Sequence, residues 1–400
     1  MLWEDVHVQA VFKTTDLLNY RTGLQVFSDH VTYQNRLDQI ISAFNQYRIP
    51  VVTLKELQID EVCPIFERIN SSGTRLSTYD LMVAATWNQE FDLNERVADV
   101  LQELHSKGFS EADRSTILKI FSAIHLGTIK EKALKSLRDV GSSEMDALIA
   151  ESKESLKRAV DFLSTTFGVK SWDFLSYEAI LIIISYIFHE KKELTPAESA
   201  RLKKWFWRSS FGERYKVGGE SFVSNDLIKV KDYVVTGSGD DAEFGSGIKP
   251  GDWEKIPFRS NVSRSRAMIL ALASLKPLNL VNGVSIDTDN ALSSYNKKEY
   301  HHFYPKAYIK TTRQLSDPNV LGNIVFITAN SNKFILDKSP QIYVPSLVAG
   351  LGNNADQIFE SNLLPIPSQF DYAKLNFNDF LAARGQLLSK FVNDRLFKGV

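Results

Sequence analysis

His301 and His302 are adjacent histidines, a residue type and spacing that could serve proton transfer or metal binding. They lie in EYHHFYPKAYIK, residues 299–310, and the chain of 400 residues contains only seven histidines. Imidazole has a pKa near ~6.5, so at neutral pH it accepts protons and binds divalent ions. Neighbouring side chains of a strand point to opposite faces. Both rings can therefore line one pocket only if the strand ends or bulges between them.

The residues downstream of this pair supply the remaining parts of a ββα unit. The stretch LGNIVFITANSNKFILDKSP, residues 321–340, contains Asn323, then the apolar run IVFIT, then NSNKFI and Asn332. The apolar run predicts a second strand and NSNKFI can begin a helix. Nucleases of the HNH, or ββα-metal, type have this order. In them a residue at the end of the first strand binds the metal, the next histidine activates water, and the helix supplies another ligand.

Together these stretches resemble the nuclease module of the GmrSD type of modification-dependent restriction systems. That module reads roughly H-H-I-x-P-K, then G-N-L-x-L-x-x-x-x-N, then K-S-P, and here Phe303 and Tyr304 stand between histidine and proline. Residues 65–87 resemble the end of the family's ParB/sulfiredoxin-like first module, and residues 205–227 the segment after its helical middle. The resemblance implies metal-dependent hydrolysis of DNA in bacterial defence against phage, with modified phage DNA as an implied partner.

The resemblance also implies a role for each residue of the motif. His302 is the general base, a role typically worth ~10²–10⁴-fold in rate. His301 and Asn332 take the metal-ligand positions and suit Mg²⁺ or Mn²⁺, while Asn323 ties down the loop between the strands and so orients His302. Simpler explanations stay open: a strand histidine bonded to a carbonyl for His302, an exposed polar residue for His301, a helix N-cap for Asn332 and a turn residue for Asn323.

Basic residues around the motif are the predicted phosphate contacts: Lys306, Lys310, Arg313 and Lys333, with Lys297 and Lys298 just before. Such contacts supply affinity rather than sequence choice, although a single surface lysine is usually only solvated. A second basic group could extend the DNA track: Arg259, Arg264 and Arg266.

One departure from the family concerns nucleotides. Its first module carries Asp-Gly-Gln-Gln-Arg, associated with nucleotide binding, and this sequence contains neither that motif nor a Walker-type glycine loop. We therefore predict no nucleotide cofactor and expect a truncated relative or a fragment, with an NTPase partner subunit or a homo-oligomer as further partners. Arg68 and Arg75, in RINSSGTRLS, could hold an anion, but this stretch reads more simply as a connector. A non-catalytic DNA-binding or assembly subunit, and an RNA-directed nuclease, remain the alternatives.

Composition and charge limit the protein classes and the cell compartment that this sequence fits. The net charge of −1 excludes a uniformly basic nucleic-acid coat. The single cysteine, Cys63, excludes a disulfide or a cysteine-based zinc site within one chain and fits a reducing compartment. No signal peptide is visible, and the longest apolar run, residues 180–188, is shorter than the ~20 residues of a membrane span. We expect a cytoplasmic protein without a membrane partner.

Periodicity predicts a mainly α-helical fold with a C-terminal α+β nuclease module. Residues 1–94 are the expected remnant of the first module, residues 95–235 a helical middle domain and residues 236–400 an HNH-like domain. A strand is predicted over 48–54, short strands alternating with helices from about 251 to 366, and a last helix over 377–397. Other helices are predicted from their ends: Ser77 with Asp80 and Thr195 with Pro196 as starts, Gly127 and Gly168 as stops. The segment 235–253, rich in Gly, Ser and Asp, is a candidate mobile loop or boundary.

Overall fold

The computed structural model describes residues 31–48, 65, 76–259, 262–294, 299–311 and 317–399. It divides the chain into two units, Met1–Ile69 and Asn70–Val400. Within the first unit, the structure describes helix α2 (Val31–Gln46). Most of the predicted strand at 48–54, together with Cys63, Arg68 and Arg75, lies outside the described residues.

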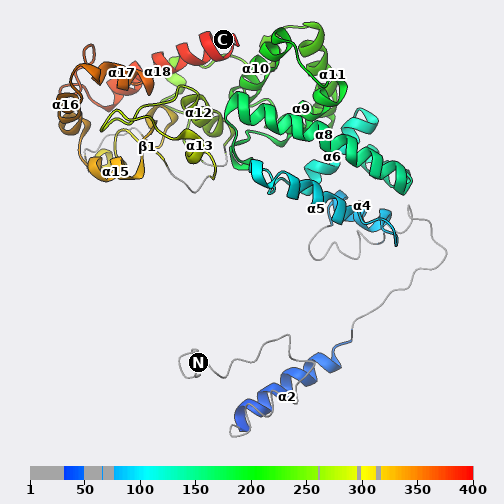
Figure 1. Cartoon of the computed structure of the whole chain (residues 1–400). Helices are drawn as coiled ribbons and strands as arrows, with labels where there is room; N and C mark the ends of the chain where they lie inside the picture. Colours follow the sequence, from blue (N-terminus) through cyan, green and yellow to red (C-terminus); the bar gives the residue numbers. More distant parts are fainter. Residues whose placement is uncertain are drawn as a thin grey trace. The chain divides into compact units, whose positions relative to one another are not determined.

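The second unit begins with a body of helices (Figure 1). These are α4 (Thr78–Thr86), α5 (Leu93–Glu103), α6 (Arg114–Leu126), α7 (Glu131–Ser136), α8 (Ser142–Phe167), α9 (Glu178–Glu190), α10 (Pro196–Phe211) and α11 (Gly219–Thr236). Helix α9, the apolar run of the sequence, contacts α6, α8 and α11 and is buried along most of its length. None of the described helices is both long enough and apolar enough to cross a bilayer.

The predicted helix ends are confirmed. Ser77 and Asp80 form a capping box at the start of α4, and Thr195 caps α10 with Pro196 in its first turn. Gly127 and Gly168 end α6 and α8 in the left-handed conformation that glycine adopts without steric cost. Local sequence signals therefore determine where these helices begin and end.

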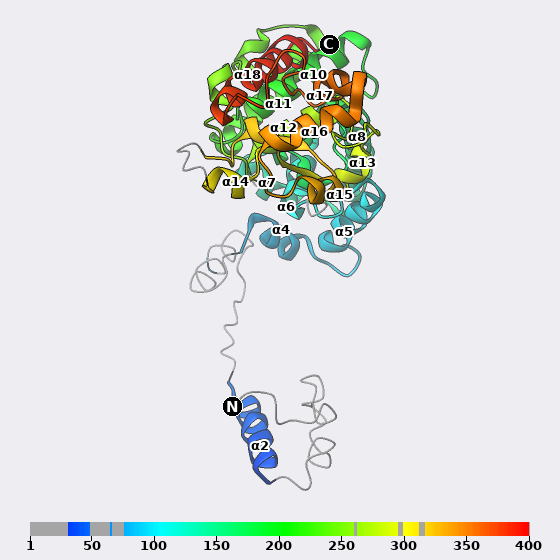
Figure 2. The ribbon, with the colours of Figure 1, turned by 90° about the vertical axis from the view of Figure 1, so that its left-hand side faces the viewer.

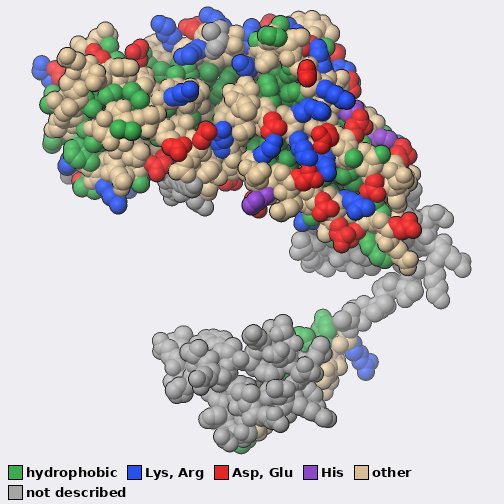
Figure 3. Space-filling model, in the orientation of Figure 1, with side chains coloured by type: hydrophobic (Ala, Val, Ile, Leu, Met, Phe, Trp, Pro, Cys, Tyr) green, Lys and Arg blue, Asp and Glu red, His purple; other side chains and the backbone are tan. Residues whose placement is uncertain are grey.

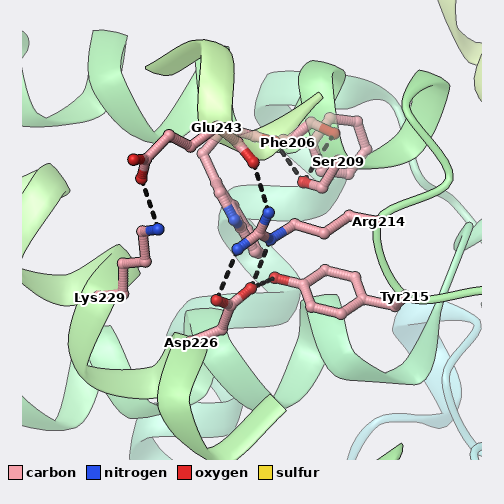
Figure 4. A network of polar contacts seen from close by, with 8 residues as sticks. Phe206, Ser209, Arg214, Tyr215, Asp226, Lys229 and Glu243 are labelled. Carbon is pink, nitrogen blue, oxygen red and sulfur yellow. Dashed lines mark hydrogen bonds and ion pairs between the residues drawn. The ribbon is translucent and has the colours of Figure 1, made fainter. Parts of the chain in front are cut away.

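A buried ion pair ties α11 to the end of α10 (Figure 4). The Arg214 guanidinium donates to both carboxylate oxygens of Asp226 at 2.5 and 2.7 Å, and the Tyr215 hydroxyl donates to the same carboxylate at 2.9 Å. A further guanidinium N–H donates to the backbone carbonyl of Glu243 at 2.6 Å. Asp226 is 2% exposed, so its charge depends on these donors rather than on water.

We expect Asp226→Ala to lower the free energy of unfolding by about 3–5 kcal/mol, because it leaves the Arg214 charge buried without its counter-ion. Urea denaturation measures this loss. Asp232→Ala, an exposed carboxylate on the same helix, is the matched control and should change stability by less than about 0.5 kcal/mol. Equal effects of the two substitutions would show that the ion pair contributes nothing to stability.

The C-terminal part of this unit combines helices with one small sheet (Figures 1 and 2). In chain order it contains α12 (Ser263–Ala273), α13 (Thr288–Ala291), β1 (Tyr300–His302), α14 (Lys306–Thr311), β2 (Ile324–Phe326), α15 (Ala329–Ile335), α16 (Pro340–Leu351), α17 (Ala355–Ser361), α18 (Phe377–Lys390) and a π-helical turn, Phe391–Leu396. The predicted last helix is thus confirmed. The alternation of several strands is wrong, because β1 and β2 are the two strands of the described region, accompanied by two isolated bridges.

The segment 235–253 is not a loose connector. It contains two short 3-10 helices, Asp241–Phe244 and Pro250–Asp252, and the side chains of Phe244, Ile248 and Trp253 are buried. Its glycines and serines suggest mobility, but three large apolar side chains anchor it to the core.

The two-stranded ribbon lies between two hydrophobic clusters. Ile324 and Phe326 of β2 belong to the cluster that fills the helical body, whereas Val325 and Ile327 belong to a second cluster formed by the C-terminal part. Alternate residues of a strand face opposite sides, so each face of the ribbon is covered by a different core. The described fold is therefore mainly α-helical, with one small antiparallel sheet.

Candidate active site at the two-stranded ribbon

The histidine pair lies at the end of β1, which pairs antiparallel with β2. The register places His301 opposite Val325 and His302 opposite Ile324. Both histidines are half-buried. The strand ends after His302 and not between the two residues, so their side chains begin on opposite faces of the ribbon. The strand itself therefore does not bring the two rings to one face.

His302 contacts a residue that the sequence analysis did not identify. Its Nε2 lies 3.1 Å from Oδ1 of Asn319, and the Asn319 amide nitrogen donates to the backbone carbonyl of Phe258 at 2.8 Å. The Phe258 N–H in turn donates to the Asn319 carbonyl at 2.8 Å. The sole signal was the position of Asn319 in DPNV, which is typical of any turn.

The surroundings keep the His302 ring neutral. Burial lowers its pKa to about 4, and the electrostatic effects of Lys306 and His301 act in the same direction. The hydrogen bond to Asn319 and the charge of Asp317 oppose this shift only in part. Below neutral pH, His302 thus remains a proton acceptor over a wider range than an ordinary histidine.

Asn323 is fully buried and fastens the loop between the strands. Its Oδ1 accepts the Tyr304 N–H at 2.8 Å, and its amide nitrogen donates to the carbonyls of Tyr304 at 3.0 Å and Pro318 at 2.9 Å. These bonds join the residues after His302 to those before Asn319. Asn323 therefore links the chain after β1 to the chain before β2, and its role in orienting His302 stays a prediction.

Arg384 of α18 holds the turn on either side of Asn323. Its guanidinium donates to the carbonyls of Gly322 at 2.9 Å and Ile324 at 2.7 Å, and also to Leu363 at 3.2 Å. Arg384 is 0% exposed, and burial lowers its pKa to about 9, so it stays charged at neutral pH. A Cβ at position 322 would lie only 3.1 Å from a carbonyl oxygen of the neighbouring segment, so this close approach favours glycine.

Helix α15 begins two residues after β2 and carries Asn332 in its first turn. Its N-cap is Thr328, not Asn332, which removes the N-cap explanation for Asn332. The Ser331 hydroxyl donates to Asn279 at 2.9 Å, and Asn279 donates to Thr328 at 3.3 Å, so the start of the helix is fixed. Among the described residues, no hydrogen-bond partner occupies the half-buried side chain of Asn332.

The first expected metal ligand, His301, begins on the face of the ribbon that carries Val325, the face opposite to that of His302. His301 lies opposite Val325, and Val325 packs in the same hydrophobic cluster as Ile335 of α15. No three His, Cys, Asp or Glu side chains gather as a metal site within the described ranges. The predicted donors, one imidazole and one amide, are fewer and uncharged. They fit a cation such as Mg²⁺, which keeps several waters and takes its charge partners from phosphate.

The predicted phosphate contacts are exposed where the structure describes them. Lys306 and Lys310 lie on α14 and Lys333 on α15, all exposed to solvent, while Arg313 lies outside the described residues. On the face shown in Figure 3, acidic and basic side chains are interspersed over the helical body. That face of the helical body therefore presents no broad basic surface.

The second basic group is not a continuous track. Arg264 donates to the Phe211 carbonyl at 2.8 Å, and Arg266 donates to the Leu175 carbonyl at 2.7 Å. Both guanidinium groups therefore hold α12 against the helical body. Arg259 is exposed, and a role of this group in extending the DNA track stays a prediction.

Comparison with known proteins gives one distant relative and no function. No protein-family model matches the sequence. The chain is 24% identical over 375 residues to Uncharacterized protein MJ0686 of Methanocaldococcus jannaschii. The match covers 86% of this chain and spans 61% of the length of that protein.

Proposed function

We propose that this chain is a metal-dependent DNA endonuclease of the ββα-metal type, acting in a restriction system against phage DNA. One observation carries the proposal. A neutral, hydrogen-bonded His302 ends the first strand, a buried Asn323 fastens the loop that leads to the second strand, and a helix follows. The resemblance of the sequence to the GmrSD-type nuclease module suggests DNA as the substrate. The exposed lysines beside the motif suit the phosphate backbone.

In this mechanism His302 accepts a proton from a water molecule. The water oxygen attacks phosphorus, the bond from phosphorus to a sugar oxygen breaks, and that oxygen leaves and takes up a proton from solvent. Lys306, Lys310 and Lys333 hold the phosphate backbone near the ring. His301 and Asn332 would hold a divalent cation, which would polarise the phosphate and stabilise the leaving oxygen.

The acid limb of the pH–rate profile should lie well below the ordinary histidine value. With a pKa of about 4, His302 stays almost fully neutral between pH 7 and pH 5.5, so the single-turnover cleavage rate should fall by less than about 1.5-fold. A base with a pKa of about 6.5 would lose about 8-fold over the same interval. Rapid-quench cleavage of saturating duplex DNA measures the difference, and an 8-fold loss would contradict the predicted environment of His302.

The proposal is tested with purified protein, supercoiled plasmid and Mg²⁺ or Mn²⁺, with EDTA as the control. Nicked or linear plasmid that appears only with the ion supports the nuclease. Parallel reactions with modified phage DNA and with RNA identify the substrate class. Binding of DNA without cleavage, under every ion tested and with added NTP, would instead favour a non-catalytic DNA-binding or assembly subunit.

A further inference from the structure

We propose that Asn319 is a positioning residue that locks His302 in the Nε2–H tautomer and leaves Nδ1 as the atom that accepts the proton. The inference rests on the proposed function for the role of Nδ1, whereas the lock itself follows from the hydrogen bonds alone.

The orientation of the Asn319 amide is set by Phe258. The Phe258 carbonyl lies 2.8 Å from one end of the amide, and a carbonyl can only accept hydrogen bonds. The amide nitrogen must therefore face Phe258, because the reverse orientation would place two acceptors in contact. The amide oxygen then faces His302, at 3.1 Å from Nε2.

The orientation of the amide determines which ring nitrogen of His302 carries hydrogen. An amide oxygen has no hydrogen to give, so the bond forms only if Nε2 is the donor. A neutral imidazole carries one N–H, and Nδ1 therefore keeps its lone pair. Asn319 is the one hydrogen-bond partner of the His302 side chain within the described residues. Nδ1 is thus left to accept a proton from water.

The backbone around Asn319 is held by antiparallel pairing with a segment that lies earlier in the sequence. Phe258 donates its N–H to Asn319, while the Leu321 N–H donates to Ile256 at 2.9 Å, so residues 256–258 run beside residues 319–321. A bridge between Pro257 and Val320 marks the same pairing. The orienting amide is therefore fixed by backbone and not by a mobile side chain.

Selective ¹⁵N-histidine labelling and NMR of the metal-free protein at neutral pH test the lock directly, with His302→Gln used to assign the signal. We expect the wild-type ring to show protonated Nε2 and unprotonated Nδ1. In Asn319→Ala we expect a mixture of tautomers and a fall in kcat of about 10–100-fold, with KM within about twofold. Asn319→Asp keeps an acceptor oxygen and should restore the single tautomer.

A wild-type ring protonated at Nδ1 would overturn the proposal even if no variant folds. So would an Asn319→Ala protein in which the tautomer and kcat both stay as in wild type. The tautomer measurement needs no DNA. A protonated Nε2 in a protein that cleaves nothing would therefore support the lock and refute the nuclease, so the two failures can be told apart.

Discussion

Replacing His302 by alanine is expected to lower the rate of DNA cleavage by about 10²–10⁴-fold, because the variant has no side chain to take the proton from water. DNA binding should persist, since the lysines proposed to contact phosphate are unchanged. Single-turnover cleavage of plasmid measures the rate, and fluorescence anisotropy with a labelled duplex measures the affinity. A split between lost cleavage and retained binding is the result that a general base predicts.

His125→Ala is the matched control for this substitution. His125 is exposed on α6, outside the ribbon, and its loss should leave both cleavage and affinity within about twofold. Thermal unfolding of both variants shows whether the fold is kept. We expect His302→Ala to stay folded, because the side-chain hydrogen bond to Asn319 is worth only about 1 kcal/mol. Wild-type cleavage by a folded His302→Ala protein would remove this residue from the mechanism.

Arg384→Met should reduce the free energy of unfolding by about 2–4 kcal/mol. Methionine fills similar space but donates nothing, so the buried carbonyls of Gly322, Ile324 and Leu363 lose the donor they share. Removal of the buried charge offsets part of this loss. The turn that carries Asn323 should loosen as well, and cleavage should fall with stability. Urea denaturation gives the first quantity and plasmid cleavage the second.

Arg395→Met isolates the effect of burial. Arg395 lies in the π-helical turn that follows α18 and is exposed. The same change of side chain should therefore shift stability by less than about 0.5 kcal/mol. If Arg384→Met is equally mild, the guanidinium does not hold the turn and our account of the site's support is wrong.

Local signals in the sequence predicted the elements well. Caps such as Ser77 and Thr195 and stops such as Gly127 act within one turn of the helix they define, so the sequence shows them directly. Segment 235–253 was misjudged because burial of its aromatic residues depends on distant helices. The two short strands were predicted, yet nothing local indicated that each face of the ribbon meets a different core.

The residues of the candidate site also differ in whether local sequence signals could predict them. The sequence order placed His302 and Asn323 in one unit, and the structure places them on the paired strands and the turn beside them; their catalytic roles stay predictions. Asn319 and Arg384 were missed because each acts through backbone carbonyls far away in the sequence. An asparagine in a turn and an arginine on a helix have ordinary local explanations. The contact of Arg264 could not be predicted for the same reason, since its carbonyl partner lies in another helix.

The double covering of the ribbon bears on how such a unit could be moved between proteins. If the chain were cut near residue 236, the ribbon would keep its contact with α12, but the face of α12 that packs on α10 would be exposed. Water would then contact side chains that are fully dry in the intact protein. Transplanting the histidine segment into a chimera therefore requires that the recipient supply a replacement surface for that face, or that the helices travel with it.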